Sequence, residues 1–185
     1  MKLVVGLGNP GRRYQQTRHN VGYAVLAELA RKCGVAAPKA RFQGEVVEAE
    51  LGAHKALLLS PTTFMNLSGT SVREAMSFYK LPTQDLLVIC DDLNLPTGKL
   101  RFRTKGSSGG QKGLEDIIGK LGTEEFARLR VGIGAVPDNW DWADYVLSKF
   151  TSEEVPVIER AAGLAADAVV AWAREDADYC MNHYN

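Results

Sequence analysis

Apolar and polar positions along the chain follow two different periods, which divide it into strands and helices. Short, continuous apolar runs are typical of buried strands and occur at Lys2–Gly6 and Asp85–Cys90. Apolar residues spaced three and four apart predict helices at Val21–Cys33, ended by Gly34, and at Ser68–Tyr79. The other predicted elements are strands at Val46–Leu51, Lys55–Ser60, Lys99–Lys105 and Arg128–Ile133, a helix at Leu114–Leu121, and a long final helix capped by Ser152.

The order of these elements predicts the fold class. Strands alternate with helices throughout, which is typical of an α/β protein. We therefore expect a single twisted sheet, mixed but largely parallel, with helices on both faces. The 185 residues suit one domain, 1–185, because domains commonly contain about 100–200 residues.

Composition excludes several classes of protein. Cys33, Cys90 and Cys180 form no CxxC pair and no Cys/His metal spacing, which favours a reduced protein over a disulfide scaffold or a zinc site. The longest apolar stretch, 161–173, contains Asp167 and is shorter than the roughly 20 residues of a membrane span. The first residues form too short an apolar run for a signal peptide. We therefore expect a cytoplasmic protein without a membrane segment.

The formal net charge is zero, but the charges are unevenly distributed. Residues 1–137 contain 19 basic and 12 acidic side chains, whereas residues 138–185 contain 3 basic and 10 acidic ones. The first part therefore carries a charge of +7 and the second −7. Such asymmetry indicates a polyanionic partner for the first part of the chain.

One predicted strand concentrates this positive charge. Lys99, Arg101, Arg103 and Lys105 occupy every second position, so on a strand they share one face. A Gly/Ser turn follows at Gly106–Gly110, and such turns offer backbone N–H groups to anions. The alternative is a solvated sheet face. We favour contact with phosphates, because four aligned cations lie beside this turn. The expected contact is with the nucleic-acid backbone and not with bases, because Phe102 falls on the opposite face of the strand and no aromatic residue shares the face of the cations.

Two short motifs resemble known sites but lack their context. Gly6–Gly11 matches GxGxxG, yet the next helical pattern starts only near Val21, whereas a dinucleotide site needs the helix immediately. Gly106–Gly110 matches the GxSxG of serine hydrolases, centred on Ser108. The one histidine after it is His183, the third residue from the end of the sequence. We therefore interpret both as glycine turns.

Polar residues at predicted strand ends form a more convincing candidate site. Asn9 follows the first strand, Asn66 follows the strand at Lys55–Ser60, and Asp91 follows the strand at Asp85–Cys90. In open α/β sheets such strand ends form the ligand crevice. If His19 joins them, it can take a proton from water while a carboxylate orients its ring and an asparagine stabilises the oxyanion. This combination predicts hydrolysis without a covalent nucleophile.

Several motifs, in order and over essentially the whole chain, resemble the bacterial-type peptidyl-tRNA hydrolases. They are Gly6–Gly11 with Tyr14, Thr17–Gly22, Pro61–Gly69, Asp91–Gly98, Gly106–Gly113 and Arg128–Gly134. The resemblance implies cleavage of the ester that joins a peptide to the 3′ end of tRNA, which releases tRNA for reuse in translation. It also implies a monomer that uses no metal or cofactor.

The resemblance assigns roles to residues by their motif positions. His19 corresponds to the general base, Asp91 to the residue that orients it, and Asn9 to a residue that separates peptidyl-tRNA from aminoacyl-tRNA. Residues expected to line the site for the tRNA 3′ end and the peptide are Tyr14, Phe64, Met65 and Asn66. Arg101, Arg103 and Arg130 correspond to tRNA phosphate contacts, in agreement with the charge pattern.

The chain departs from the family at Gln111-Lys112, where the family often has His-Asn. That asparagine binds substrate, so we expect Lys112 to bind a phosphate or a peptide carbonyl instead. Two other functions remain open from the sequence. One is a non-enzymatic RNA-binding protein on the same scaffold, like a chloroplast intron-splicing factor, and the other is a serine esterase that uses Ser108.

Overall fold

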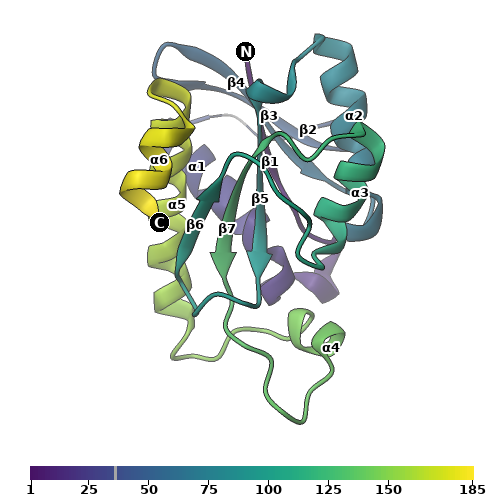
Figure 1. Cartoon of the computed structure of the whole chain (residues 1–185), viewed down its shortest axis with the longest axis vertical. Helices are drawn as coiled ribbons and strands as arrows, with labels where there is room; N and C mark the ends of the chain where they lie inside the picture. Colours follow the sequence, from purple (N-terminus) through teal and green to yellow (C-terminus); the bar gives the residue numbers. More distant parts are fainter. Residues whose placement is uncertain (36) are drawn as a thin grey trace.

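Figure 1 shows the computed structural model of the chain, which describes residues 1–35 and 37–185. Within these ranges seven strands form one sheet in the order β2-β3-β4-β1-β5-β7-β6. The strands are β1 (Lys2–Gly6), β2 (Lys39–Arg41), β3 (Gly44–Leu51), β4 (His54–Pro61), β5 (Leu86–Asp92), β6 (Leu100–Arg103) and β7 (Ala127–Gly132). The central strands β4, β1, β5 and β7 are parallel, whereas β2, β3 and β6 join through antiparallel pairs. The predicted mixed, largely parallel sheet is confirmed.

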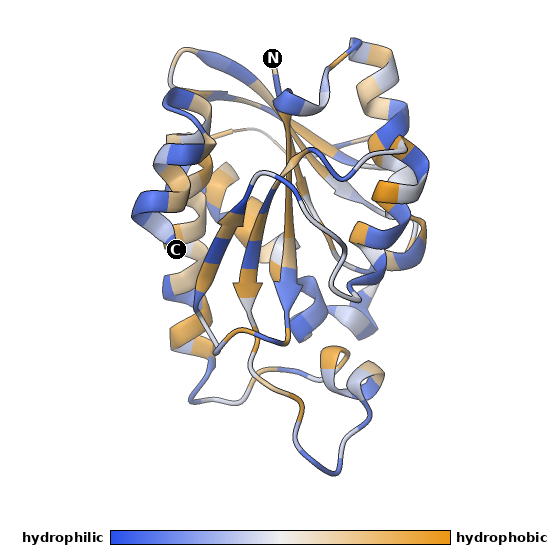
Figure 2. Ribbon diagram, viewed as in Figure 1, coloured by the Kyte–Doolittle hydropathy of each residue, from blue (hydrophilic) through white to orange (hydrophobic). Residues whose placement is uncertain are grey.

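Helices cover both faces of this sheet (Figure 1). They are α1 (Val21–Cys33), α2 (Ser68–Tyr79), α3 (Lys112–Leu121), α4 (Trp142–Val146), α5 (Val155–Arg174) and α6 (Ala177–Tyr184). One hydrophobic core lies between the sheet and helices α1, α5 and α6, and a second lies between the sheet and helices α2 and α3. Successive residues of β1 alternate between them, with Val4 in the first core and Leu3 and Val5 in the second. The central strands β1 and β5 are accordingly apolar along most of their length, whereas the edge strand β6 alternates between apolar and polar residues (Figure 2).

The predicted boundaries agree for three elements and are shifted for others. The strand at Lys2–Gly6 and the helices at Val21–Cys33 and Ser68–Tyr79 have the predicted bounds. Other strands are shifted: β5 extends through Asp91 and Asp92, and β6 covers only the middle of Lys99–Lys105. The sequence pattern did not predict β2, α4 or α6, which contain three to eight residues.

The prediction for the start of the final helix is wrong. Thr151, and not Ser152, makes the capping contacts. The Glu154 backbone N–H donates to the Thr151 hydroxyl at 3.3 Å, and the Thr151 backbone N–H donates to the Glu154 carboxylate at 2.8 Å. This reciprocal pair is a capping box centred on Thr151. The long helix itself is confirmed as α5, which ends at Arg174, but it is not the last one, because α6 follows it.

Two glycines bring α1 unusually close to the parallel strands. A Cβ at Gly22 meets the Leu7 amide nitrogen at 2.5 Å and the Ile89 carbonyl oxygen at 2.7 Å, and a Cβ at Gly6 meets the Gly22 carbonyl at 2.4 Å. The first glycine of the GxGxxG motif therefore serves helix–strand packing. The same approach sets the residues before α1 beside the end of β5.

Gly22→Ala is expected to destabilise the fold, because the atoms nearest to the added Cβ belong to the backbone of the central strands and cannot move aside as a flexible side chain can. Overpacking of this kind costs about 1–3 kcal/mol of unfolding free energy, measurable by urea denaturation. The matched control is Gly163→Ala in α5, where nothing lies within 4 Å of the added Cβ. The control is expected to stabilise the protein by about 0.5–1 kcal/mol. Equal effects at both positions would contradict the packing argument.

No helix among the described residues has both the length and the apolar character to cross a lipid bilayer.

Candidate active site

His19 and Asp91 form a direct pair. His19 lies in a one-turn helix, Arg18–Asn20, immediately before α1, and Asp91 lies near the carboxyl end of β5. The His19 Nδ1 and Asp91 Oδ2 atoms are 2.9 Å apart, and the two residues are only 8% and 4% exposed. The carboxylate therefore fixes the Nδ1 proton, which leaves Nε2 as the basic nitrogen of the neutral ring.

Asn9 follows β1, the parallel neighbour of β5, and its side chain has a fixed orientation. Its Oδ1 accepts a hydrogen bond from the Met65 backbone N–H at 2.7 Å. Its backbone is held by Asn20, whose carboxamide accepts from the Asn9 N–H at 2.9 Å and donates to the Asn9 carbonyl at 3.0 Å. Because Oδ1 is occupied, the amide nitrogen of Asn9 is the group available as a donor. The sequence motif contained Asn20, but its clamping role was not predicted.

Gln111 is a further residue of the site that sequence reasoning assigned no role. It lies at the N-terminus of α3, and its amide nitrogen is 3.1 Å from Asp91 Oδ1. The residue beside it, Lys112, is exposed, and its ammonium pairs with Glu115 at 2.9 Å. The two positions of the family departure thus differ: Gln111 contacts the candidate catalytic carboxylate, and Lys112 lies at the rim.

A cavity of about 410 Å³ opens at the His19–Asp91 pair. Three further groups line it: polar and charged residues at the end of β5, the glycine turn before α3, and Trp142 and Val146 of α4. The exposed Trp142 was also missed, because a five-residue helix leaves little periodic signal. The cavity can admit water and a substrate ester next to the histidine.

The predicted aromatic residues lie together on the surface. Tyr14 and Phe64 pack edge to face with ring centroids 6.4 Å apart, and Phe64 is 52% exposed. The Phe64 backbone has φ 61° and ψ 154°, a conformation essentially restricted to glycine. Strain retained at an exposed aromatic residue is typical of a binding position. Asn66 is exposed in the next turn of chain, Met65–Leu67.

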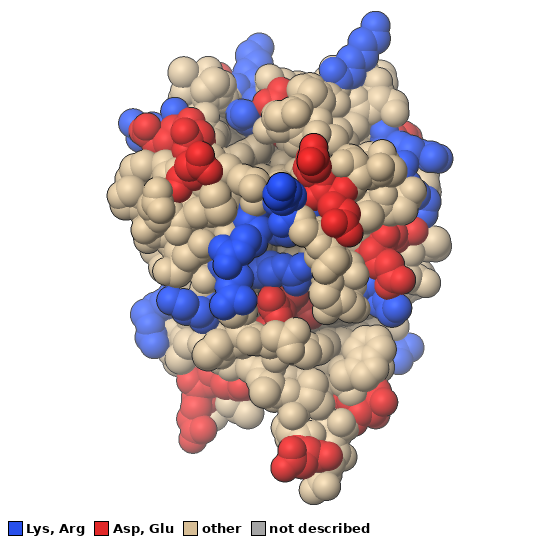
Figure 3. All heavy atoms as spheres, in the orientation of Figure 1, with Lys and Arg blue, Asp and Glu red and all other residues tan. Residues whose placement is uncertain are grey.

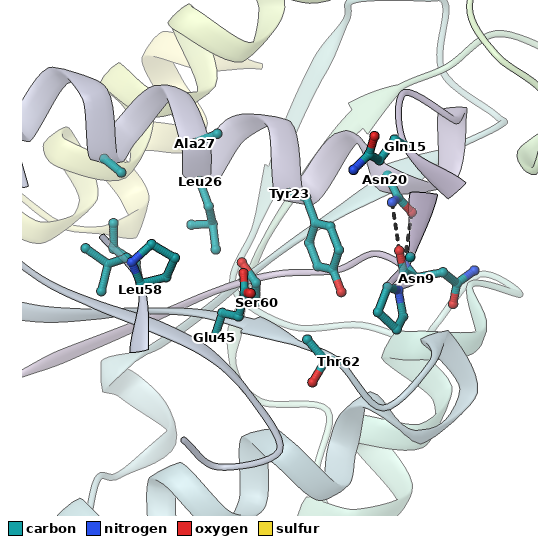
Figure 4. A pocket seen from close by; sticks show the side chains of 15 residues that line it. Asn9, Gln15, Asn20, Tyr23, Leu26, Ala27, Glu45, Leu58, Ser60 and Thr62 are labelled. Carbon is teal, nitrogen blue, oxygen red and sulfur yellow. Dashed lines mark hydrogen bonds between the residues drawn. The ribbon is translucent and has the colours of Figure 1, made fainter. Parts of the chain in front are cut away.

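A second cleft, of about 480 Å³, starts at Asn9 and Asn20 and runs between α1 and strands β3 and β4 (Figure 4). Tyr23 projects into it from α1, and its hydroxyl donates to the Pro61 carbonyl. Burial, with the nearby Glu45 carboxylate as a smaller contribution, raises the pKa of Tyr23. Tyr23 therefore remains protonated and links α1 to β4 beside Asn9.

The basic residues predicted from the sequence line one face of β6 and β7. Arg101 and Arg103 are exposed, and they pair across the strands with Arg130 and Arg128 respectively. Figure 3 shows the resulting patch of positive charge, with acidic side chains at its border. Like charges directly opposite each other are unfavourable, so this arrangement suits an anionic partner.

The two arginines of β7 are already engaged by the Gly/Ser turn. Arg128 is 1% exposed and donates to the carbonyls of Gly106 and Ser107, and burial lowers its pKa from the usual value. Arg130 donates to the carbonyls of Ser107 and Ser108 and lies 3.6 Å from Asp92. The turn thus uses its carbonyls to hold arginines, and Arg130 retains only part of its donor capacity for a phosphate.

Arg18 anchors the segment that carries His19. Its guanidinium donates to both carboxylate oxygens of Glu154 at 2.8 Å and to the Ile133 carbonyl at 3.2 Å. The ring faces of Tyr145 and Phe150 lie 4.4 and 4.9 Å from its central carbon. This largely buried side chain therefore ties the histidine to the chain on either side of α4.

Acidification is expected to weaken this anchor. Two hydrogen bonds from Arg18 lower the pKa of Glu154 below its usual 4.5. The Arg18–Glu154 pair therefore makes its full contribution to the free energy of unfolding above the pKa that Glu154 has in the unfolded chain. That contribution is lost as pH falls through the lower pKa of Glu154 in the folded protein. Glu154→Gln is expected to reduce the unfolding free energy by about 1.5–3 kcal/mol at neutral pH, with a smaller difference below pH 4.5, in urea titrations.

Glu28→Gln provides the control, since Glu28 pairs with an exposed arginine, Arg31. Exposed pairs contribute about 0–1 kcal/mol, so this variant should resemble the wild type. A Glu154→Gln difference that stays constant from neutral to acidic pH would contradict the proposed linkage.

The fold and the site together define a class of protein. It is a mixed α/β protein in which a His–Asp pair lies at the carboxyl end of β5 and a fixed asparagine follows the neighbouring parallel strand β1, on the same molecule as a cationic surface. These groups can activate water and stabilise an oxyanion. Among the described residues, no group of three or more potential metal-ligating side chains lies together.

Comparison with known proteins identifies the family. A family model described as peptidyl-tRNA hydrolase matches residues 3–185. The peptidyl-tRNA hydrolase of Rhodopirellula baltica is 52% identical over all 185 residues and 97% of that protein, and that of Desulfitobacterium hafniense is 49% identical over the full length of both. A crystal structure of the Acinetobacter baumannii peptidyl-tRNA hydrolase, 35% identical, superposes with a TM-score of 0.94 over 100% of this chain and 94% of that one.

This chain belongs to the peptidyl-tRNA hydrolase family. The predicted resemblance is confirmed, and these findings give no support to the alternative of a non-enzymatic RNA-binding protein. Nor do they support a serine esterase; Ser108 accepts a hydrogen bond from the Gly110 N–H, while the imidazole of His183 stacks on Tyr179 in α6.

Proposed function

We propose that this protein hydrolyses the ester bond between peptide and tRNA, with His19 as the general base. Nε2 of His19 takes a proton from water, whose oxygen attacks the ester carbonyl carbon. Asp91 holds the ring and stabilises the imidazolium that forms. The proton then passes to the departing 3′-oxygen of tRNA, and the peptide leaves as a carboxylate. The observation that carries this proposal is the buried 2.9 Å contact between His19 and Asp91.

Asn9 supplies selectivity for a blocked amine in this scheme. With its Oδ1 held by Met65, Asn9 presents an N–H donor to the substrate. A peptide carbonyl accepts that hydrogen bond, whereas the free ammonium of an aminoacyl-tRNA is itself a donor and cannot. The same donor is suited to the oxyanion that develops as water adds.

The remaining predicted residues bind the two ends of the substrate. Tyr14, Phe64, Met65 and Asn66 contact the tRNA 3′ end and the first residues of the peptide, and Lys112 contacts a phosphate or carbonyl at the rim. Arg101, Arg103 and Arg130 contact tRNA phosphates. The protein acts as a single domain, 1–185, and as a monomer in the cytoplasm, with water and these side chains as the reacting groups.

Neutralising the exposed arginines of β6 is expected to weaken tRNA binding and its salt dependence. Each phosphate contact contributes a slope of roughly 0.7–0.9 to the fall of log K with log salt concentration, so Arg101→Ala with Arg103→Ala should flatten the slope by about 1.4–1.8. Filter binding at several salt concentrations measures this. Arg73→Ala with Arg160→Ala, on exposed positions of α2 and α5, removes the same charge as a control. If the slopes of log K against log salt concentration are equal for the two double variants, Arg101 and Arg103 do not contact tRNA phosphates.

The proposed activity is tested by measuring tRNA binding and ester cleavage in the same reaction. The substrate is an aminoacyl-tRNA acetylated on its amine. We expect release of the N-acetylamino acid and free tRNA, with many turnovers per protein molecule. Stable binding of the tRNA without release would show a binding protein and contradict the proposal.

A further inference from the structure

The Gln111 carboxamide is locked in one orientation by the backbone of α3. Its Oε1 accepts the Leu114 backbone N–H at 2.8 Å, which makes Gln111 the N-cap of the helix. The other end of the amide, Nε2, must then point away as a donor, and it lies 3.1 Å from Asp91 Oδ1. The residue is only 8% exposed, so water competes little for either contact.

Asp91 consequently receives a donor on each oxygen. Oδ1 faces Gln111 and Oδ2 faces His19. Rotation of the carboxylate breaks both contacts, so the occupied Oδ1 determines which oxygen remains for the histidine. We propose that Gln111 is a positioning residue, which holds the Asp91 carboxylate and reduces the negative charge that His19 experiences. This role rests on the proposed function of the His19–Asp91 pair.

The other charged groups at the cavity do not replace this contact. Lys112 pairs with Glu115, Arg130 lies near Asp92 and the Gly/Ser turn, and Arg18 is directed to Glu154. In the described part of the chain, His19 and Gln111 are the two side chains hydrogen-bonded to Asp91. An amide does not titrate, so its donation to Asp91 is constant across the working pH range.

Gln111 also connects Asp91 to the asparagine of the site. Its Nε2 lies 3.2 Å from the sulfur of Met65, and a Cβ at Gly113 would lie 2.6 Å from the same sulfur. The start of α3 therefore packs tightly against Met65, whose backbone N–H holds Asn9. The Gln111 amide thus contacts Asp91 directly and, through Met65, supports the residue that holds Asn9.

Two variants separate positioning from helix capping. Gln111→Met keeps the size but loses the cap and the donor, whereas Gln111→Glu keeps an oxygen for the Leu114 N–H and replaces the donor to Asp91 by a negative charge. If Gln111 acts only as a cap, the methionine variant loses stability, but its folded form keeps the wild-type kcat. If it positions Asp91, both variants lower kcat by about tenfold with little change in KM, as expected for a lost hydrogen bond to a charged group.

The protonation of His19 gives a readout that needs no substrate. The chain has three histidines, so NMR titration can follow His19 with His54 and His183 as internal references. Without the Gln111 donor, Asp91 presents more negative charge to the imidazolium, and the His19 midpoint should rise by about 0.5–1 pH unit in the methionine variant. The rise should be larger in the glutamate variant, which adds a second negative charge, while His54 and His183 do not move.

A rescue experiment tests the polarity of the contact. In Asp91→Asn the donor of Gln111 attracts the new carbonyl oxygen, which turns the new NH₂ group toward His19. Adding Gln111→Glu supplies an acceptor instead, turns the amide around and returns an oxygen to the histidine. The double variant should therefore cleave N-acetylaminoacyl-tRNA faster than Asp91→Asn alone.

An unshifted His19 midpoint in the methionine variant, or a double variant slower than Asp91→Asn, would overturn the role of Gln111. The NMR titration keeps this conclusion separate from the proposed activity. If the wild type fails to cleave its substrate but His19 still responds to Gln111, the proposed function fails while the positioning contact stands. Unfolding curves of each variant confirm that the compared proteins are folded.

Discussion

His19→Ala is expected to lower the cleavage rate of peptidyl-tRNA by about 10²–10⁴-fold, the usual contribution of a general base. Removal of the imidazole leaves water without a proton acceptor, while Asn9 and the basic face of β6 and β7 remain. The Kd for tRNA should therefore stay close to the wild-type value. Single-turnover cleavage of N-acetylaminoacyl-tRNA and filter binding measure the two quantities.

His54→Ala is the matched control, because His54 is exposed at the start of β4 and far from the site in sequence and fold. It should cleave at the wild-type rate. Ser108→Ala should also change the rate little, because Ser108 has no role in the proposed reaction. Near-normal turnover in His19→Ala, or complete loss in Ser108→Ala with tRNA binding retained, would contradict the assignment of the base.

Asp91→Asn is expected to reduce the cleavage rate nearly as much as His19→Ala does, although it replaces only one oxygen atom by nitrogen. The fixed Gln111 donor attracts the amide oxygen, so the amide nitrogen faces His19 Nδ1. Nδ1 must then accept a hydrogen bond, which moves the ring proton to Nε2 and blocks it as a base. The corresponding change in Ser-His-Asp proteases costs about 10⁴ in kcat, and we expect about 10²–10⁴ here.

Asp92→Asn serves as its control, since Asp92 is the next residue on β5 and contacts Arg130 and the Asn94 backbone, not His19. It should retain most of the kcat. A loss equal to that of Asp91→Asn would indicate that negative charge in the cavity matters and that ring orientation does not. NMR of His19 in the two variants can distinguish its tautomers directly.

The sequence predicted the layers of the fold because its long elements have clear apolar periods. Both α1 and α2 have strong helical faces, and β1 is a continuous apolar run. The short elements β2 and α4 were missed because three to five residues contain too little of a period. Ser152 was chosen as a cap by residue type, whereas the cap depends on the reciprocal contact between Thr151 and Glu154.

The candidate site was predictable only in part. Asn9 and Asp91 follow from polar residues at strand ends, and His19 follows from the family motif. The structure places Asn9 and Asp91 after or at the ends of neighbouring parallel strands, with His19 in contact with Asp91. Asn20 and Gln111 act through contacts between residues 11 and 20 positions apart, which no local pattern reveals. The charge pattern predicted the exposed arginines of β6 but not the engagement of Arg128 and Arg130 by turn carbonyls.

The most direct test of the central claim compares one aminoacyl-tRNA with its amine acetylated or free. The same concentration of wild-type protein is added to each, and the initial rate of ester cleavage is measured. We predict that the acetylated form is cleaved at least about tenfold faster, because the free ammonium cannot accept the Asn9 hydrogen bond. Equal cleavage of the two forms, or cleavage of neither, would contradict the account.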